Sequence, residues 1–221
     1  MKSNQKTNQC SWFHLLHKKM ISINLNLPRK NDMRVMLTSC GIETDEIKKH
    51  FLKMLGKKPS DTSALFIPTA AIDADAIAVL PKCMNDLLKC GIPKDKIQVF
   101  DLHRNMQIEE LQSVDVIYLC GGRTSYLLER LNKTGFRETL LSYIQDDGFV
   151  IGVSAGSVVF ADNLPESLGL LDAKLNVHCK KSNITGPVHF PLAENIELSN
   201  TAAMLIRNIP DDVEIVDNEM H

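Results

Sequence analysis

The sequence predicts an α/β fold in which a mainly parallel sheet is covered by helices on both faces. Three observations lead to this expectation. Short apolar runs alternate with longer amphipathic segments from residue 33 onward, which is the order of strands and helices in such folds. Several runs are continuously apolar, as strands buried on both faces require. One of these runs ends in a small-residue turn that leads directly into a further apolar segment, over 149–160.

The expected strands and helices follow one another along the chain. Strands are expected at 34–39, 64–68, 96–101, 114–120 and 149–153, with helices at 44–55, 75–89, 108–112, 124–133 and 136–146. A further strand is expected at 175–179. No internal repeat or linker follows residue 33, so 33–221 is expected to form a single domain.

Residues 1–32 differ in composition from the rest of the chain. They are rich in Lys, Asn, Gln and Ser, and their apolar residues form no run long enough for a signal-peptide core or a membrane span. We therefore expect a poorly ordered N-terminal extension over 1–32.

Composition narrows the class of protein. The 221 residues are 44% hydrophobic and carry a net charge of −2, so electrostatics offers no reason to expect binding to nucleic acid or to a membrane. The six cysteines contain no Cys-x-x-Cys pair. They indicate reduced thiols of a cytoplasmic protein rather than a zinc site or a disulfide framework, and no cofactor is expected.

The turn after the strand at 149–153 has the layout of a nucleophile elbow. Its sequence is Gly152-Val153-Ser154-Ala155-Gly156, the Gly-x-Ser-x-Gly pattern. In such an elbow a strand delivers the serine to the edge of the sheet, and the flanking glycines allow the strand and the following helix to approach closely. Ser154 is therefore the expected nucleophile. Many unrelated loops contain the same short pattern, and it is the strand before it and the helix pattern after it that favour catalysis.

A second glycine pair follows the strand at 114–120. Reactive groups in parallel sheets gather at the carboxyl ends of the strands, and Gly121-Gly122 occupies such an end. If the two strands are neighbours, the amides of Gly122 and Ala155 can face one another as an oxyanion hole. The alternative is a simple turn before a helix.

A serine hydroxyl needs a base, and the base needs a group that orients it. His178, at the end of the strand at 175–179, is the expected base, and His189 is the competitor. Among carboxylates after the elbow, Glu166 is the expected acid, with Asp162 and then Asp172 as alternatives.

The motifs resemble those of a known family. The segments 119–128 and 151–157, then 168–171 with Val177-His178, are similar to the successive motifs of the peptidase E family, the aspartyl dipeptidases to which cyanophycinase is also related. The resemblance implies a class I glutamine amidotransferase-like fold, a three-layer αβα sandwich around a mainly parallel sheet. It also implies a serine nucleophile and cleavage of dipeptides after an N-terminal aspartate without a metal. By position, Ser154 corresponds to the nucleophile, His178 to the base and Gly122 to an oxyanion donor, with an acid near Glu166.

The chain departs from the family pattern in three places. Arg123 stands where the family often has asparagine, and Val177-His178-Cys179 replaces Pro-His followed by an aromatic residue. The arginine-bearing segment that binds the substrate aspartate in peptidase E is not recognisable in 180–183. These departures concern specificity more than chemistry, and Arg123 is the expected substitute for reading an acidic side chain because guanidinium can bind a carboxylate in a bidentate manner.

The sequence thus predicts a serine-type peptidase that acts on short peptides, in particular dipeptides with an N-terminal acidic residue. A small peptide is the expected partner, and the chain is compatible with a homodimer. Two alternatives remain open at this stage: a relative without catalysis that binds a small ligand or a partner in the same cleft, and a serine esterase or amidase of other specificity.

Overall fold

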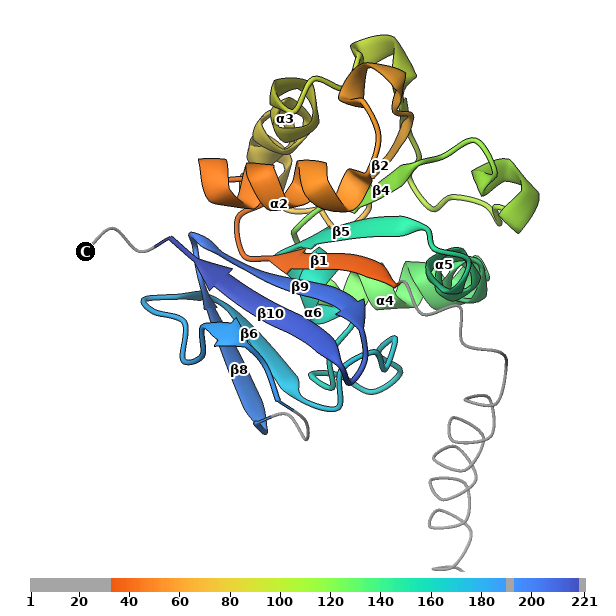
Figure 1. Ribbon diagram of the computed structural model, residues 1–221. Helices are drawn as coiled ribbons and strands as arrows, with labels where there is room; N and C mark the ends of the chain where they lie inside the picture. The colour runs from red at the N-terminus through yellow and green to blue at the C-terminus, as the bar shows by residue number, and fades with distance from the viewer. Residues whose placement is uncertain (1–32, 190–192, 219–221) are drawn as a thin grey trace, which may run out of the picture. The chain divides into compact units, whose positions relative to one another are not determined.

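A sheet of eight strands lies at the centre of the structure, a computed structural model that describes residues 33–189 and 193–218 (Figure 1). The strand order is β3-β2-β4-β5-β1-β9-β10-β7. The first five in this order pair in parallel, and the last three are antiparallel to their neighbours. The strand bounds are β1 (Arg34–Thr38), β2 (Ala64–Ile67), β3 (Ile97–Val99), β4 (Val116–Leu119), β5 (Phe149–Val153), β7 (Gly186–Pro187), β9 (Ala202–Asn208) and β10 (Asp212–Asp217).

Helices cover both faces of this sheet. On one side lie α2 (Asp45–Leu55) and α3 (Ala74–Lys89), and on the other lie α4 (Thr124–Lys133), α5 (Phe136–Gln145) and the single turn α6 (Ala155–Val158) (Figure 1). Short 3-10 turns complete the described helical segments: η2 (Pro59–Asp61), η3 (Lys94–Lys96) and η4 (Ile108–Leu111). In the part of the chain that the structure describes, no helix combines the length and apolarity that a membrane span requires.

The two faces of each strand enter different cores. In β4, Tyr118 packs with α2 and α3, whereas Ile117 and Leu119 pack with α4 and α5. The same division holds in β1, where Met36 faces α2 while Val35 and Leu37 face the opposite layer. All of these side chains are fully buried, which explains why the runs are continuously apolar.

The predicted fold class is confirmed. The observed helices and parallel strands lie within a few residues of the predicted ranges from 34 to 153. The last three strands of the sheet were not predicted, although β9 contributes buried residues to both cores and β10 to one of them. The N-terminal extension expected at 1–32 lies outside the described residues.

A small second sheet stands beside the elbow. It consists of β6 (Lys174–Cys179) and β8 (Asn195–Ser199), which pair in parallel. The pairing shifts between Asn176, opposite Glu197, and Cys179, opposite Ser199. Two residues, Val177 and His178, therefore face a single residue of β8, and such a bulge redirects the side chains that it carries.

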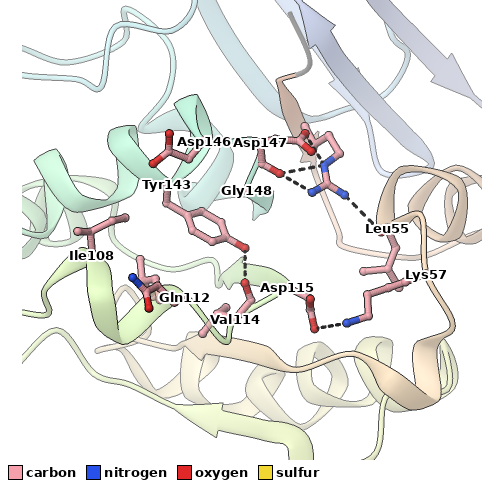
Figure 2. Close-up of a pocket in the computed structure, with 12 residues that line it drawn as sticks. Leu55, Lys57, Ile108, Gln112, Val114, Asp115, Tyr143, Asp146, Asp147 and Gly148 are labelled. Atoms are coloured by element: carbon pink, nitrogen blue, oxygen red, sulfur yellow. Dashed lines mark hydrogen bonds and ion pairs between the residues drawn. The ribbon is translucent and has the colours of Figure 1, made fainter. Parts of the chain in front are cut away.

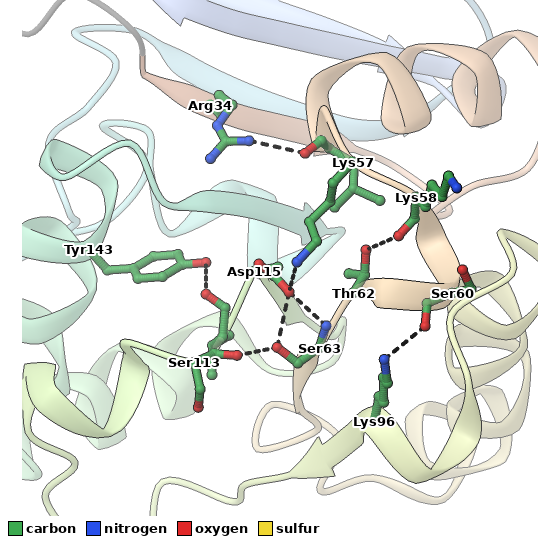
Figure 3. Close-up of polar contacts among 12 residues, drawn as sticks. Arg34, Lys57, Lys58, Ser60, Thr62, Ser63, Lys96, Ser113, Asp115 and Tyr143 are labelled. Carbon is green, nitrogen blue, oxygen red and sulfur yellow. Dashed lines mark hydrogen bonds and ion pairs between the residues drawn. The ribbon is translucent and has the colours of Figure 1, made fainter.

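The amino ends of the strands are joined by polar contacts. Asp115, just before β4, accepts a hydrogen bond from Lys57 at 2.9 Å (Figures 2 and 3) and one from the amide of Ser63 at 2.8 Å (Figure 3). The Tyr143 hydroxyl donates to the carbonyl of Val114 at 3.1 Å (Figure 2). Arg34 at the start of β1 forms an ion pair with Asp147 at 2.9 Å. These contacts satisfy charges and carbonyls at the edge of the sheet opposite Ser154 and indicate a structural role for this edge.

The Asp115 contacts predict a measurable contribution to stability. Burial alone would raise the pKa of Asp115, but the Ser63 and Lys57 donors outweigh it and hold that pKa below its ordinary value. Asp115→Ala should lower the free energy of unfolding by about 1–2 kcal/mol at pH 7, because the part-buried amide of Ser63 and the exposed ammonium of Lys57 lose their acceptor. The difference from the wild type should shrink as the pH falls toward about 3, since protonation removes the charge that stabilises the folded state.

Urea unfolding at both pH values measures this effect. Asp172→Ala is the matched control, because Asp172 is exposed and its side chain forms no hydrogen bond or ion pair with the described residues. Equal unfolding free energies for the Asp115 and Asp172 variants would contradict the assigned role.

Candidate active site

Ser154 occupies a strained turn between β5 and α6. Its backbone has φ 51° and ψ −113°, a conformation that non-glycine residues rarely adopt. The flanking glycines have the steric role expected of them. A Cβ on Gly152 would lie 2.4 Å from the carbonyl oxygen of Gly156, and a Cβ on Gly156 would lie 2.3 Å from that of Leu119. Any side chain at either position would therefore force the elbow apart.

The carboxyl end of β1 holds this turn in place. The amide of Ser154 donates to the carbonyl of Thr38 at 2.9 Å. The buried hydroxyl of Ser157 donates to the same carbonyl at 2.8 Å and accepts from the Thr38 amide at 2.9 Å. The hydroxyl of Thr38 in turn donates to the carbonyl of Gly152 at 3.1 Å. Hydrogen bonds to Thr38 thus hold the strained turn both before Ser154, at Gly152, and after it, at Ser157.

His178 reaches Ser154 from the bulge of β6. Its Nε2 lies 2.9 Å from Ser154 Oγ. This is a hydrogen-bond distance, as proton transfer from a hydroxyl to a general base requires. The bulge gives His178 a positive φ of 59°, and its amide donates to the hydroxyl of Ser39 at 3.2 Å. Ser39 follows β1 directly and donates to the carbonyl of Leu198 at 3.0 Å. The same end of β1 therefore positions both members of the pair.

Asn200 occupies the place next to the imidazole where an acid was expected. Its Oδ1 lies 3.0 Å from His178 Nδ1. An amide oxygen there accepts from Nδ1–H and leaves Nε2 free to accept the serine proton, which is the tautomer that a base requires. Sequence reasoning missed Asn200 because it searched for a carboxylate and because β8 was not predicted. The only local signal is a polar Ser-Asn-Thr turn between two apolar runs.

The turn that carries Asn200 is braced by Asp217. The Asp217 carboxylate accepts hydrogen bonds from the hydroxyls of Ser199 and Thr201, both at 2.8 Å, and from Ser182 at 2.5 Å. Burial would raise the pKa of Asp217, but these donors outweigh it and keep that pKa below its ordinary value. A charged Asp217 therefore holds both neighbours of Asn200 at neutral pH.

Cys40 is a second residue that sequence reasoning did not assign to the site. Its thiol donates to Asn200 Oδ1 at 3.2 Å and lies 3.6 Å from His178 Nδ1. Burial raises the pKa of Cys40, which Lys82 only partly offsets, so the thiol stays protonated and can donate. The oxygen of Asn200 is thus held from two sides, which favours the orientation that faces the imidazole.

The structure does not bring the expected acids to His178, and this corrects the expected arrangement. Glu166 lies in an exposed loop, where its carboxylate accepts a hydrogen bond from Asn132 at 3.3 Å. Asp162 and Asp172 are exposed and form no side-chain hydrogen bond with the described residues. The competing base, His189, is exposed and lines a different hollow together with Arg207 and Asp212.

The glycine pair after β4 lies against Ser154. A Cβ on Gly121 would lie 3.0 Å from the Cβ of Ser154. Gly122 has φ +139°, and a Cβ there would lie 2.0 Å from the carbonyl oxygen of Ala70, so this position requires glycine. Among the described residues, no acceptor takes a hydrogen bond from the amide of Gly122 or of Ala155. Both amides are therefore available to a developing oxyanion.

Arg123 is engaged elsewhere. Its guanidinium forms an ion pair with Asp73 at 2.8 Å, and both side chains are more than half exposed. Arg123 is not among the residues that line the cavity beside Ser154. Its expected role in reading substrate charge stays a prediction from the sequence.

The cavity beside Ser154 has a volume of ≈ 570 Å³. It is lined by Cys40, His178 and Asn200, by Gly121 and Gly122, and by residues of α3. Such a volume suits a small ligand rather than a folded chain. Within 33–189 and 193–218, no cluster of three or more His, Cys, Asp or Glu residues is arranged to hold a metal ion.

Comparison with known proteins connects this geometry to a family. The model of peptidase family S51 matches residues 35–172, which include Gly122 and Ser154 but end before His178 and Asn200. An uncharacterized peptidase of Pasteurella multocida (strain Pm70) is 29% identical over 102 residues, 46% of this chain and 49% of the relative. Another, from Listeria innocua serovar 6a (strain ATCC BAA-680 / CLIP 11262), is 30% identical over 99 residues, 45% of this chain and 47% of the relative. The matched segment thus spans about half the length of the curated relatives.

Solved structures extend the likeness of fold beyond that segment. A crystal structure of a Listeria monocytogenes EGD-e protein assigned to peptidase E has a TM-score of 0.63 at 21% identity, covering 85% of this chain and 100% of its own. A peptidase from an acI-B1 Actinobacterium has the same TM-score at 17% identity, covering 85% of this chain and 88% of its own. At this level of identity the similarity concerns the fold.

The position of Asn200 leads to a prediction that separates it from Glu166. Asn200→Ala should lower kcat/KM for peptide hydrolysis by on the order of 10-fold to 100-fold, because the imidazole loses the group that selects its tautomer. Glu166→Gln should leave kcat/KM unchanged within about twofold, since the carboxylate lies away from His178. Steady-state kinetics on both variants measure this, and a larger loss for Glu166→Gln than for Asn200→Ala would restore the acid expected from the sequence.

Proposed function

Since the chain belongs to peptidase family S51, we propose that it is a serine-type peptidase that hydrolyses short peptides with Ser154 as nucleophile and His178 as base. The observation that carries the proposal is the 2.9 Å distance between Ser154 Oγ and His178 Nε2 at the strained elbow. A serine hydroxyl and an imidazole at this distance are the core of nucleophilic acyl transfer. The size of the adjoining cavity favours a short peptide.

The positions of these atoms support the following reaction. His178 Nε2 takes the proton of Ser154 Oγ as the oxygen attacks the substrate carbonyl, and a tetrahedral intermediate forms. Its oxyanion accepts hydrogen bonds from the amides of Gly122 and Ala155, and losing one such donor typically costs about 3 kcal/mol of transition-state stabilisation. The imidazolium then protonates the leaving amine, and the peptide bond breaks. Water, activated by the same imidazole, hydrolyses the acyl-enzyme.

With Asn200 as the third member, this Ser-His arrangement differs from a triad in which a carboxylate contacts the imidazole. A neutral amide orients the imidazole but adds no negative charge to stabilise the imidazolium that forms during attack. Cys-His-Asn enzymes use an amide at the same position, so a neutral third member is compatible with catalysis. We infer that Asn200 acts by orientation, with Cys40 and Asp217 holding it in place.

A preference for an N-terminal acidic residue is the finer hypothesis that the resemblance to peptidase E supports. Arg123, expected to bind that carboxylate, is paired with Asp73. The proposal therefore extends to short peptides in general, and Asp-X dipeptides belong in the first substrate panel.

The nucleophile can be tested directly. Ser154→Ala should lower peptide hydrolysis by at least about 10³-fold and abolish labelling by a fluorophosphonate probe, because both require the activated hydroxyl. His178→Ala should cost a similar factor, and the double variant little more, since the two residues act as a unit. Ser125→Ala is the matched control, because Ser125 is an exposed serine of α4. Intact-mass analysis measures the label, and circular dichroism verifies the fold.

Three results would contradict the proposal. Hydrolysis that survives Ser154→Ala would exclude Ser154 as the nucleophile. Wild-type protein that neither reacts with several serine probes nor hydrolyses any peptide would indicate a relative that only binds in the cleft. Turnover of esters without peptides would indicate an esterase.

Because Asn200 is neutral, introducing a charge at this position should change the pH profile of kcat/KM. Asn200→Asp places a carboxylate beside Nδ1–H, which stabilises the protonated imidazole and makes it a base only at higher pH. The acid limb of kcat/KM should therefore move upward by about one pH unit. Asn200→Ser, which adds no charge, is the control and should leave the limb in place. An unmoved limb in Asn200→Asp would mean that this side chain does not face the catalytic imidazole.

A further inference from the structure

One wall of the cavity beside Ser154 is an apolar stripe of α3. Ala76, Val79, Leu80 and Cys83 line the cavity, and their spacing places them on one face of the helix. Val79 is 49% exposed although it is a large aliphatic residue. Val153, the last residue of β5, adds apolar surface next to Ser154. An exposed valine that lines this cavity is surface that a ligand can cover.

The charges that line the same cavity are predominantly negative. Among the described lining residues, Glu43 and Asp75 carry carboxylates and Lys82 is the one ammonium. Lys82 Nζ lies 2.5 Å from Glu43 Oε2 and donates to the carbonyl of Cys40 at 2.9 Å. Burial would lower the pKa of Lys82, but Glu43 and Asp86 outweigh it and hold the pKa above its ordinary value. The ammonium is thus charged and already occupied by acceptors.

An acidic substrate side chain would be disfavoured in this setting. It would face two carboxylates, and it would have to displace Glu43 or share Lys82 with it. Removing a carboxylate from water without a free partner is costly. An aliphatic or thioether side chain meets the opposite situation, because it covers Val79 and Leu80 and leaves the Lys82 ion pair intact.

We propose that the apolar face of α3 is the specificity wall of the site, so that the enzyme prefers short peptides whose attacked residue, the one contributing the scissile carbonyl, has an apolar side chain such as leucine or methionine. The inference rests on the proposed function and adds its substrate class. It replaces selection by a cation with selection by apolar contact.

A panel of matched dipeptides tests the proposal. Leu-Leu and Met-Leu should be hydrolysed by the full chain with kcat/KM at least about 10-fold above that for Asp-Leu and Ala-Leu, since even one methylene in an apolar pocket changes kcat/KM by about 10-fold or more. Val79→Ala should lower kcat/KM for Leu-Leu more than for Ala-Leu, because the wall loses contact with the longer side chain only.

Inverting the wall provides the sharper experiment. Val79→Arg adds a second cation to the cavity, one helical turn from Asp75, so that the two carboxylates no longer outnumber the cations. It should shift the ratio of kcat/KM for Asp-Leu over Leu-Leu upward by at least about 10-fold. Ile77→Arg is the matched control: Ile77 lies on the same helix, is 51% exposed and does not line the cavity. The control should leave the ratio unchanged. Thermal unfolding verifies that both variants fold, and Val79→Ala carries the test if Val79→Arg does not.

The outcomes separate this inference from the proposed function. Fluorophosphonate labelling of Ser154 together with preferential hydrolysis of Asp-Leu would overturn the apolar specificity and leave the serine peptidase standing. A ratio that Val79→Arg and Ile77→Arg change equally would overturn it as well. Absence of both labelling and hydrolysis would overturn the proposed function, and the specificity with it.

Discussion

The carboxyl end of β1 is the constraint on which the rest of the site depends. Thr38 accepts and donates the hydrogen bonds that hold the elbow, and Ser39 accepts from the amide of His178. The elbow and the β6 bulge lie 24 residues apart in sequence. Both are therefore held in place by hydrogen bonds to the same two residues, Thr38 and Ser39. The 2.9 Å distance between Ser154 Oγ and His178 Nε2 depends on this shared attachment to the end of β1.

Both members of the pair sit on unfavourable backbone conformations. Ser154 and His178 have φ values of 51° and 59°, and such positions typically cost on the order of 1–3 kcal/mol each. The cost is tolerated because β5 is buried throughout, β1 is buried from Val35 onward, and both strands pair with strands on both sides. The stability of the buried sheet thus offsets the backbone strain at Ser154 and His178, which lifts the hydroxyl and turns the imidazole toward it. This is how a stable core and a reactive surface coexist in one small domain.

Neutral and paired groups surround this reactive centre. Asn200 contributes orientation without charge, Cys40 is held as a thiol, and Lys82 is occupied by Glu43. Two carboxylates outside the cavity lining stabilise the segments that support the site: Asp217 braces the turn that carries Asn200, and Asp86 accepts from the amide of Ile42 and the hydroxyl of Tyr118 behind the β1–α2 loop. Asp217 and Asp86 thus position residues that support the site, whereas α3 gives the cavity an apolar wall.

The sequence by itself determined the α/β class, the helices and parallel strands up to Val153, and the elbow with Ser154, because these follow from local periodicity and from glycines that a tight turn requires. It also singled out His178 and the pair Gly121-Gly122, through motifs at predicted strand ends. Only the tertiary structure decided that Asn200, rather than Glu166, faces the imidazole, that Cys40 supports it, and that Arg123 pairs with Asp73. The physical reason is that these contacts join residues 22 to 160 positions apart, and a sequence pattern carries no information on which of several polar side chains the packing of strands will bring together.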